Sequence, residues 1–348
     1  MWLVFLFRMF FESVNMSNPV EKIATRKSFG DALAKLGAKY KNIVVLDADL
    51  SCSVQTGKFA KEFPERHFNM GIAEQNLIGT AAGFATRGKV AFACSFAMFS
   101  AGRPWEIIRN AVCYPNLNVK ILGSHAGILT GEDGASHQAL EDIAIMRVLP
   151  NMKVVSPADH YEMLSAVEAS YHEFGPVYIR AARQATPVLY AGVGVGADGE
   201  LERNSVVADF KFGKSDVLHG ADYKKADLCV FATGPLVASS IYAAQKIEED
   251  VGKKIIVVNV SSIKPIDFDS ILRCALRSKI CVTAEDHSVI GGLGGAVSEV
   301  FAENGVGVKL VRIGMHDKFG ESGKPADLYK KYGFDEAGME KILREILG

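Results

Sequence analysis

The alternation of short apolar runs with helical segments constrains the fold of this chain most. Beyond Asn18, runs of strand length alternate with segments whose apolar residues recur at helical spacing. The expected strands are 42–47, 90–94, 119–122, 153–155 and 176–180, and the expected helices are 22–39, 74–86, 103–113, 138–147 and 160–173. Strands and helices that alternate in this way form largely parallel sheets. The sequence therefore predicts an α/β fold.

The alternation breaks near the middle of the chain. Residues 191–199 are rich in glycine, and no clear period returns until Asp227. Further strands are then expected at 228–232, 254–260, 280–285 and 308–312. The 348 residues are enough for two domains. We expect a first domain at 20–187, a linker at 188–226 and a second domain at 227–348.

The first residues need a separate interpretation. Residues 1–11 are mostly apolar, but the run is shorter than the roughly 20 apolar residues that a bilayer requires. A basic start and a small-residue cleavage site, which a signal peptide would have, are missing. We interpret 1–19 as a disordered or misannotated extension, with Met16 as the expected start.

Charge and cysteine content narrow the classes of function. The 39 Lys and Arg residues against 40 Asp and Glu residues give a net charge of −1. This balance provides no basic surface for nucleic acid or for an anionic membrane, although a small anionic ligand needs only a few local cations. The six cysteines form no C-x-x-C pair and no cluster with histidine. We therefore expect no metal site in this chain and a reducing compartment, the cytoplasm.

The densest group of candidate functional residues surrounds Glu74. This glutamate is expected at the start of a helix, and its helical neighbours Met70, Leu77 and Ile78 are apolar. A buried carboxylate there would hold its proton more tightly and could exchange it with a ring nitrogen of a ligand. On periodicity alone, a solvated glutamate favoured by the helix dipole is the better interpretation.

Two further segments are candidates, each with an ordinary alternative. Phe96 and Phe99 are spaced to form an aromatic platform for a flat heterocycle, but spacing alone favours core packing. The stretch 123–138 is rich in glycine, contains two histidines and follows an expected strand. In open α/β folds ligands bind at such loops, and a turn with polar side chains explains the pattern equally well.

Cations and a second glycine-rich turn carry less information. Arg26, Arg180 and Arg183 are scattered, and a single arginine is more often in a surface ion pair than on a phosphate. The turn 291–295 lacks the spacing of a dinucleotide-binding fingerprint. Tight packing of a strand against a helix explains those glycines better.

Taken together, four segments resemble the pyrimidine-binding half of the transketolase family in order and spacing. They are Lys22-Ile-Ala-Thr-Arg26-Lys, Asp47-Ala-Asp49-Leu, Gly71-Ile-Ala-Glu74-Gln-Asn76 and Gly131-Glu-Asp133-Gly-Ala-Ser-His137-Gln. The resemblance covers nearly everything from about Val20 to the end. It implies two doubly wound domains, a thiamine-diphosphate pyrimidine-binding domain followed by a smaller transketolase C-terminal-like domain.

The resemblance also implies roles by position. Glu74 matches the glutamate that bonds to N1′ of the cofactor's aminopyrimidine, and Glu74 and His137 are the expected catalytic residues. The remaining matches are Phe96 and Phe99 for pyrimidine stacking, Asp49 for the same cleft, Asp133 and His137 for the donor sugar's hydroxyls, and Arg26, Ser53, His125 and Arg183 for the sugar phosphate. A guanidinium suits a phosphate dianion, so these matches favour sugar phosphates over plain 2-oxoacids as substrates.

Two positions depart from the family pattern, and one motif is missing. Ala126 stands where a full-length transketolase has an acidic residue, and Gly102 stands where a tyrosine usually helps hold the pyrimidine. The family binds pyrophosphate and a divalent metal with Gly-Asp-Gly, and this chain has none. The resemblance therefore implies that thiamine diphosphate and Mg²⁺ are shared with an N-terminal partner subunit that holds the metal, in a dimer or a heterotetramer.

The resemblance leaves three other functions open. The chain could be the beta subunit of a 2-oxoacid dehydrogenase or part of an enzyme similar to 1-deoxyxylulose-5-phosphate synthase. From a different class, it could be a non-catalytic assembly or regulatory subunit that kept the fold. Retention of Glu74, Asp133 and His137 argues against the last function.

Overall fold

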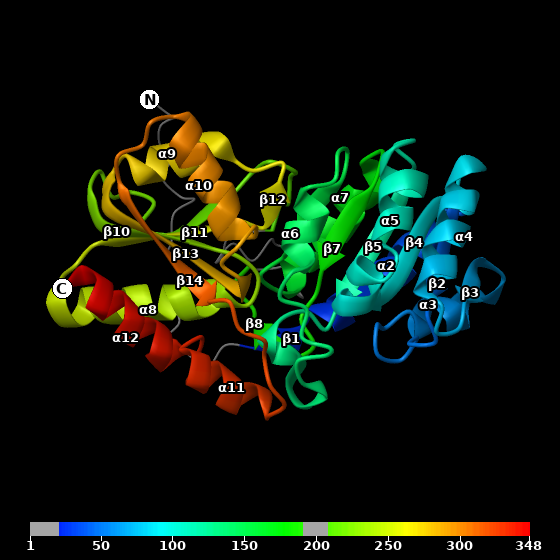
Figure 1. Ribbon diagram of the computed structural model, residues 1–348, viewed down its shortest axis with the longest axis horizontal. Coiled ribbons are helices and arrows are strands. Elements are labelled where there is room, and N and C mark those ends of the chain that lie inside the picture. The colour runs from blue at the N-terminus through cyan, green and yellow to red at the C-terminus, as the bar shows by residue number, and fades with distance from the viewer. Residues whose placement is uncertain (1–20, 191–207) are drawn as a thin grey trace, which may run out of the picture.

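The computed structural model describes residues 21–190 and 208–348, which form a seven-stranded and a five-stranded sheet flanked by helices, together with one small two-stranded sheet (Figure 1). The first domain contains β1 (Lys22–Ala24), α2 (Thr25–Lys39), β2 (Ile43–Asp47), α3 (Gly57–Glu62), β3 (His67–Asn69), α4 (Glu74–Thr86), β4 (Val90–Phe96), α5 (Trp105–Ile107), β5 (Val119–Ser124), α6 (Asp142–Arg147), β6 (Lys153–Val155), α7 (His160–His172), β7 (Val177–Arg180) and β8 (Ala185–Pro187). The expected α/β fold is confirmed.

The main sheet of the first domain has the strand order β12-β6-β7-β5-β4-β2-β3 and is parallel except at β12. Side chains of a strand point alternately to its two faces. Along β2, Val44 and Leu46 pack with α4 and α6, whereas Ile43 and Val45 pack with α2 and α7. Both faces are therefore buried, which explains why the strands are continuously apolar.

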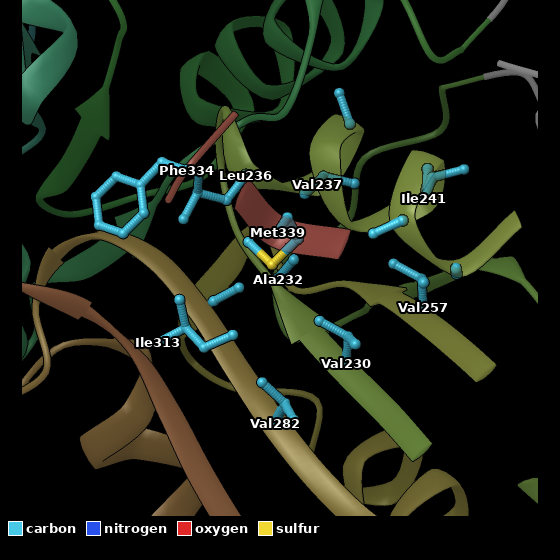
Figure 2. Packing of buried hydrophobic residues seen from close by; sticks show 14 of the residues in the cluster. Val230, Ala232, Leu236, Val237, Ile241, Val257, Val282, Ile313, Phe334 and Met339 are labelled. Atoms are coloured by element: carbon cyan, nitrogen blue, oxygen red, sulfur yellow. The ribbon is translucent and has the colours of Figure 1, made fainter. Parts of the chain in front are cut away.

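The second domain contains β9 (Asp216–His219), β10 (Ala226–Ala232), α8 (Leu236–Val251), β11 (Ile255–Asn259), β12 (Ser262–Lys264), α9 (Phe268–Ala275), β13 (Ser278–Ser288), α10 (Leu293–Glu303), β14 (Lys309–Met315), α11 (Pro325–Tyr332) and α12 (Glu336–Leu347). Its sheet has the order β14-β13-β10-β11-β9. Helices α8 and α12 cover one face, where Val230 and Val282 meet Ile241 and Met339 (Figure 2). Helices α9 and α10 cover the other face.

The predicted boundaries need correction where tertiary pairing decides the structure. Residues 188–226 were expected to be a linker, but β9 lies in this range and pairs with β11. Strand β12 of the second domain joins the first domain's sheet, antiparallel to β6. Both strands are short, so their own periodicity is too weak to predict them.

Two elements near the candidate site also differ from expectation. Strand β4 extends to Phe96, and the helical stretch beyond it begins with a π-helical turn at Met98–Gly102. The helix expected at 138–147 begins only at Asp142. The glycine-rich turn 291–295 does open α10, as expected from tight packing: a Cβ at Gly292 would lie 2.0 Å from Glu285 Oε2.

Candidate active site

Glu74 is the first residue of α4, which follows the short strand β3 after a tight turn. The turn is set by Asn69, whose Oδ1 accepts a hydrogen bond from the backbone N–H of Gly71 at 2.9 Å, and Gly71 has a φ of 68°. The Glu74 side chain is buried, at 4% exposure. The alternative of a solvated glutamate is therefore wrong, and a carboxylate is held inside the protein at a helix N-terminus that favours its charge.

The partner of this carboxylate is Arg103, which is not among the residues predicted from the sequence. Arg103 Nη1 donates to Glu74 Oε2 at 3.0 Å, and the guanidinium carbon lies 4.5 Å from the centroid of the Phe99 ring. A flat cation thus lies over an aromatic face and donates to a buried carboxylate. The spacing of four residues between Phe99 and Arg103 on a helical segment was the available signal.

The two phenylalanines and the two histidines form one aromatic group. The Phe96 and Phe99 centroids are 6.3 Å apart with planes at 17°. His125 stacks on Phe96 at 3.9 Å, and the His137 ring meets the Phe99 ring edge-on at 5.1 Å. Phe96 and Phe99 also contact the core on α2 and α7, so they combine core packing with an aromatic surface.

Residues 125–138, here called the histidine loop, carry His125, Asp133 and His137 from the end of β5. His125 is buried and has a φ of 56°, a conformation that costs a non-glycine residue about 1–3 kcal/mol. Its carbonyl accepts from Thr130 Oγ1 at 2.6 Å. Burial, together with Arg26, Arg183 and His137, lowers the pKa of His125 to about 3. The imidazole is therefore neutral at neutral pH.

Two arginines converge beside the histidine loop. Arg26, at the start of α2, donates from Nη1 to the Ser53 carbonyl at 2.8 Å and from Nε to the Arg183 carbonyl at 3.1 Å. Arg183 Nη1 lies 3.2 Å from Asp133 Oδ2. Burial and the charge of Arg183 lower the pKa of Arg26. Two neighbouring guanidinium groups form a positive site that suits an anion such as a phosphate.

Arg180 and Arg183 differ in burial and in the groups they contact. The Arg180 side chain is 4% exposed and its Nε donates to Asp142 Oδ2 at 2.9 Å, so it forms a buried ion pair between elements of the fold. Arg183 is partly exposed and reaches the histidine loop. Of the two, Arg183 is the one that can contact a ligand.

Asp49 lies just after β2 and contacts the turn that precedes Glu74. It has a φ of 61°, and its Oδ1 accepts from Asn69 Nδ2 at 2.8 Å, the same asparagine that shapes the turn before Glu74. Beneath it, Asp47 Oδ2 accepts from Ser51, Thr56 and His67, which fixes the segment that carries Asp49 and Ser53. Asn69 and Asp47 were not predicted, because their roles depend on contacts between separate loops.

The structure thus brings all ten predicted residues together. Asp49 is bonded to Asn69, which shapes the turn before Glu74. Contacts then run from Glu74 through Arg103 and Phe99 to His137, and from Phe99 through Phe96 to His125. Arg26, Ser53, Asp133 and Arg183 are linked on the other side of His125. A buried carboxylate, an aromatic surface and two guanidinium groups therefore lie in one connected set of residues.

The residues fit the aminopyrimidine of thiamine diphosphate. Arg103 shows the chemistry that this position accepts: a planar N–H donor that stacks on Phe99 and donates to Glu74. An aminopyrimidine that carries a proton on N1′ has the same two properties.

In residues 21–190 and 208–348, no group of three or more His, Cys, Asp or Glu side chains could hold a metal ion.

None of the helices in the described ranges has the length and apolar character needed to cross a bilayer. Five of the six cysteines are buried free thiols, and Cys52 is an exposed one.

Comparisons with known proteins identify the family of both domains. Residues 21–188 match the transketolase pyrimidine-binding domain, and residues 221–339 match the transketolase C-terminal domain. The chain is 50% identical over 320 residues, 92% of this chain and 95% of the other, to a putative transketolase C-terminal section of Methanocaldococcus jannaschii. It is 35% identical, over 92% of this chain and 94% of the other, to a 6-deoxy-6-sulfo-D-fructose transketolase subunit of a Clostridium species.

A solved structure extends the comparison to three dimensions. The structure, described as a split gene transketolase in an inactive beta4 tetramer, is 45% identical and superposes with a TM-score of 0.80 over 93% of this chain and 98% of the other. Family, relatives and structure thus agree on both domains. The chain belongs to the transketolase family and comprises its pyrimidine-binding and C-terminal domains.

Proposed function

We propose that this chain is the C-terminal subunit of a two-chain transketolase that moves a two-carbon ketol unit from a ketose phosphate to an aldose phosphate. The observation that carries the proposal is the buried carboxylate of Glu74, which Arg103 links to the Phe99 ring, with His137 against the same ring. The adjacent Arg26 and Arg183 support a phosphorylated substrate.

Each candidate residue of the chain is assigned one role in the reaction. Thiamine diphosphate supplies the reactive carbon and the electron sink that carbon–carbon bond cleavage next to a carbonyl requires. Glu74 binds the N1′ position of the pyrimidine and exchanges a proton there, in place of its present contact with Arg103. Phe96 and Phe99 orient the pyrimidine by stacking. His137 and Asp133 bind the sugar hydroxyls, and the neutral His125 provides a hydrogen bond rather than a charge.

The phosphate of the sugar is assigned to Arg26 and Arg183, with Ser53 and His125 beside them. The Arg26 bonds to the Ser53 and Arg183 carbonyls hold its guanidinium in place before the substrate binds. Arg183 is held in the same way by the Thr130 carbonyl and by Asp133. A relative that is 35% identical is described as acting on a sulfonated sugar, so the anion of the substrate is the feature to test first.

A partner subunit completes the proposal. The sequence has no Gly-Asp-Gly segment, so the pyrophosphate of the cofactor and Mg²⁺ are assigned to an N-terminal subunit. A similar chain forms an inactive tetramer of beta subunits, which agrees with a requirement for another chain. We propose a heterotetramer with two copies of each half, working in the cytoplasm, where free thiols persist.

The test is ketol transfer from xylulose 5-phosphate to ribose 5-phosphate with thiamine diphosphate and Mg²⁺. The chain is assayed alone and then mixed with the N-terminal transketolase subunit of its source organism. We expect no activity alone and activity in the mixture. Activity of the chain alone would refute the split site. A stable but inactive mixture would favour the beta subunit of a 2-oxoacid dehydrogenase, a deoxyxylulose-phosphate-synthase-like enzyme or a non-catalytic subunit.

A further inference from the structure

A carboxylate of the second domain holds the histidine loop of the first. Asp286 lies near the end of β13, and its Oδ1 accepts from the backbone N–H of Ile128 at 2.8 Å. Its Oδ2 lies 3.5 Å from the backbone nitrogen of Leu129. These two N–H groups begin the 3-10 turn at Ile128–Asp133, where N–H groups lack partners within the turn. Asp286 therefore caps the turn that leads to Asp133, although it lies 158 residues from Ile128 in the sequence.

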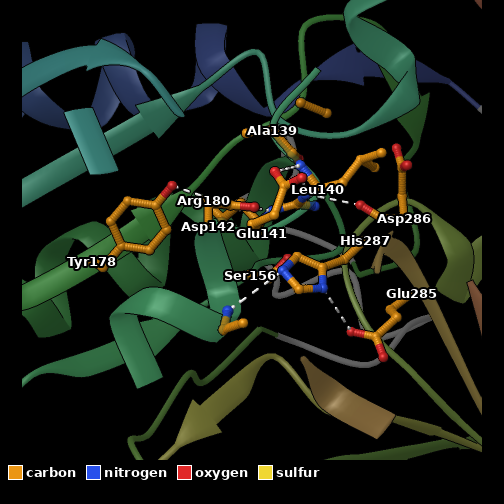
Figure 3. A network of polar contacts seen from close by, with 12 residues as sticks. Ala139, Leu140, Glu141, Asp142, Ser156, Tyr178, Arg180, Glu285, Asp286 and His287 are labelled. Carbon is orange, nitrogen blue, oxygen red and sulfur yellow. Dashed lines mark hydrogen bonds and ion pairs between the residues drawn. The ribbon is translucent and has the colours of Figure 1, made fainter. Parts of the chain in front are cut away.

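Asp286 is itself fixed on both its side chain and its main chain. The Tyr329 hydroxyl of α11 donates to Asp286 Oδ2 at 2.9 Å. The Asp286 carbonyl accepts from Arg180 Nη2 at 2.8 Å, and Figure 3 shows these two residues meeting across the domain boundary. A side chain at position 127 would not fit, since a Cβ on Gly127 would lie 2.3 Å from Asp286 Oδ2. The carboxylate position thus determines the path of the loop after His125.

The far end of the histidine loop is held by a second segment of the same domain, residues 320–325. Gln138 Nε2 donates to the Glu321 carbonyl at 2.9 Å, and Ser322 Oγ donates to the Glu132 carbonyl at 2.6 Å. At Gly131, a Cβ would lie 2.7 Å from Pro325 Cγ. The second domain therefore contacts the loop on either side of Asp133.

From this geometry we infer that Asp286 is a positioning residue of the active site, through which the second domain fixes His125, Asp133 and His137 for the donor sugar. This inference rests on the proposed function of those three residues. The domain thereby contributes to donor binding without touching the sugar. Glu74 and Phe99 lie outside the loop, on α4 and on the π-helical turn after β4, so Asp286 acts on the pyrimidine site only indirectly, through the ring contacts of His125 and His137.

The variant Asp286→Asn removes the charge with little change of shape, and Tyr329→Phe removes only one partner of the carboxylate. Asp267→Asn is the matched control. Asp267 is a buried carboxylate of the same domain that also accepts from two backbone N–H groups, those of Ser270 and Ser215, but it caps α9 and does not contact the loop.

The first measurement is amide hydrogen exchange of the full chain, compared over peptides that cover 125–138 and α4. Loss of a charged hydrogen bond is expected to speed exchange in the loop peptide of Asp286→Asn by about tenfold or more. Tyr329→Phe should show a smaller increase, and Asp267→Asn none. Unchanged exchange in 125–138 for Asp286→Asn would overturn the inference.

The second measurement uses the complex with the N-terminal subunit. For Asp286→Asn we expect the KM for xylulose 5-phosphate to rise by about tenfold, while the affinity for thiamine diphosphate stays within twofold. Faster loop exchange with unchanged KM and kcat would overturn the positioning role. A wild-type complex that transfers no ketol unit would instead refute the proposed function, while the exchange data would still decide whether Asp286 holds the loop.

Discussion

Removal of Arg180 should destabilise the protein more than any exposed charge change. The variant Arg180→Met leaves Asp142 as a buried carboxylate with only the Tyr178 hydroxyl on Oδ2. Burial alone would raise the pKa of Asp142, but the Arg180 charge reverses this and holds the pKa below its usual value. In the variant the ionised carboxylate is therefore uncompensated.

The magnitude follows from the geometry of this pair. The two side chains are 4% and 1% exposed, so solvent screening gives no discount. Breaking one partner of a buried ion pair costs about 3–5 kcal/mol. Arg180 also loses bonds to the Ala139 and Asp286 carbonyls, which lie on either side of the domain boundary (Figure 3). We therefore expect a loss of about 4 kcal/mol, or roughly 10 °C in the unfolding midpoint.

The assay is urea unfolding followed by circular dichroism, with thermal unfolding as a second measure. The control Lys279→Met removes an exposed ion pair with Asp227 and should cost about 0–1 kcal/mol. The double variant Arg180→Met/Asp142→Leu should recover part of the loss, because it removes the unpaired Asp142 carboxylate. The rest of the loss should remain, because the buried Asp286 still lacks the nearby Arg180 charge. A loss below about 1 kcal/mol for Arg180→Met alone would refute the reasoning.

Four other predictions concern the site. Glu74→Gln in the mixed complex should lower kcat by about a hundredfold or more without preventing assembly, whereas Glu106→Gln, at an exposed position, should leave kcat unchanged. A kcat of Glu74→Gln within tenfold of wild type would contradict the role of Glu74. Arg26→Ala should raise KM about tenfold or more for xylulose 5-phosphate but not for xylulose, and an equal effect on both sugars would remove Arg26 from the phosphate site. Arg103→Ala should bind thiamine diphosphate about two- to fivefold more tightly in a fluorescence titration, because a half-exposed ion pair no longer competes for Glu74; weaker binding would mean that Arg103 contacts the cofactor. His125 has a pKa of about 3 in the folded state and 6.5 in the unfolded state, so the unfolded state binds the proton first and the free energy of unfolding falls as pH decreases through this window. Between pH 6.5 and about pH 4, His125→Asn should therefore lose about 2–3 kcal/mol less stability than wild type. Parallel curves of stability against pH for the two proteins would contradict this.

The sequence by itself determined the α/β class and, through the family resemblance, selected the ten candidate site residues. Apolar runs report that a strand is buried on both faces, and the segments around Glu74, Asp133 and His137 carried the family resemblance. These signals are local, because each depends on residues that are neighbours in the chain. The roles assigned to these residues stay predictions until the experiments above are done.

Only the tertiary structure decided how those segments meet. Strand β12 joins the sheet of the other domain, Arg103 takes the place beside Glu74, and Asp286 reaches the N–H of Ile128 across 158 positions of sequence. Whether a polar side chain is solvated or pairs with a distant group depends on strand order and on domain contact. Periodicity describes the exposure of one segment at a time, and it therefore cannot predict a hydrogen bond between two segments.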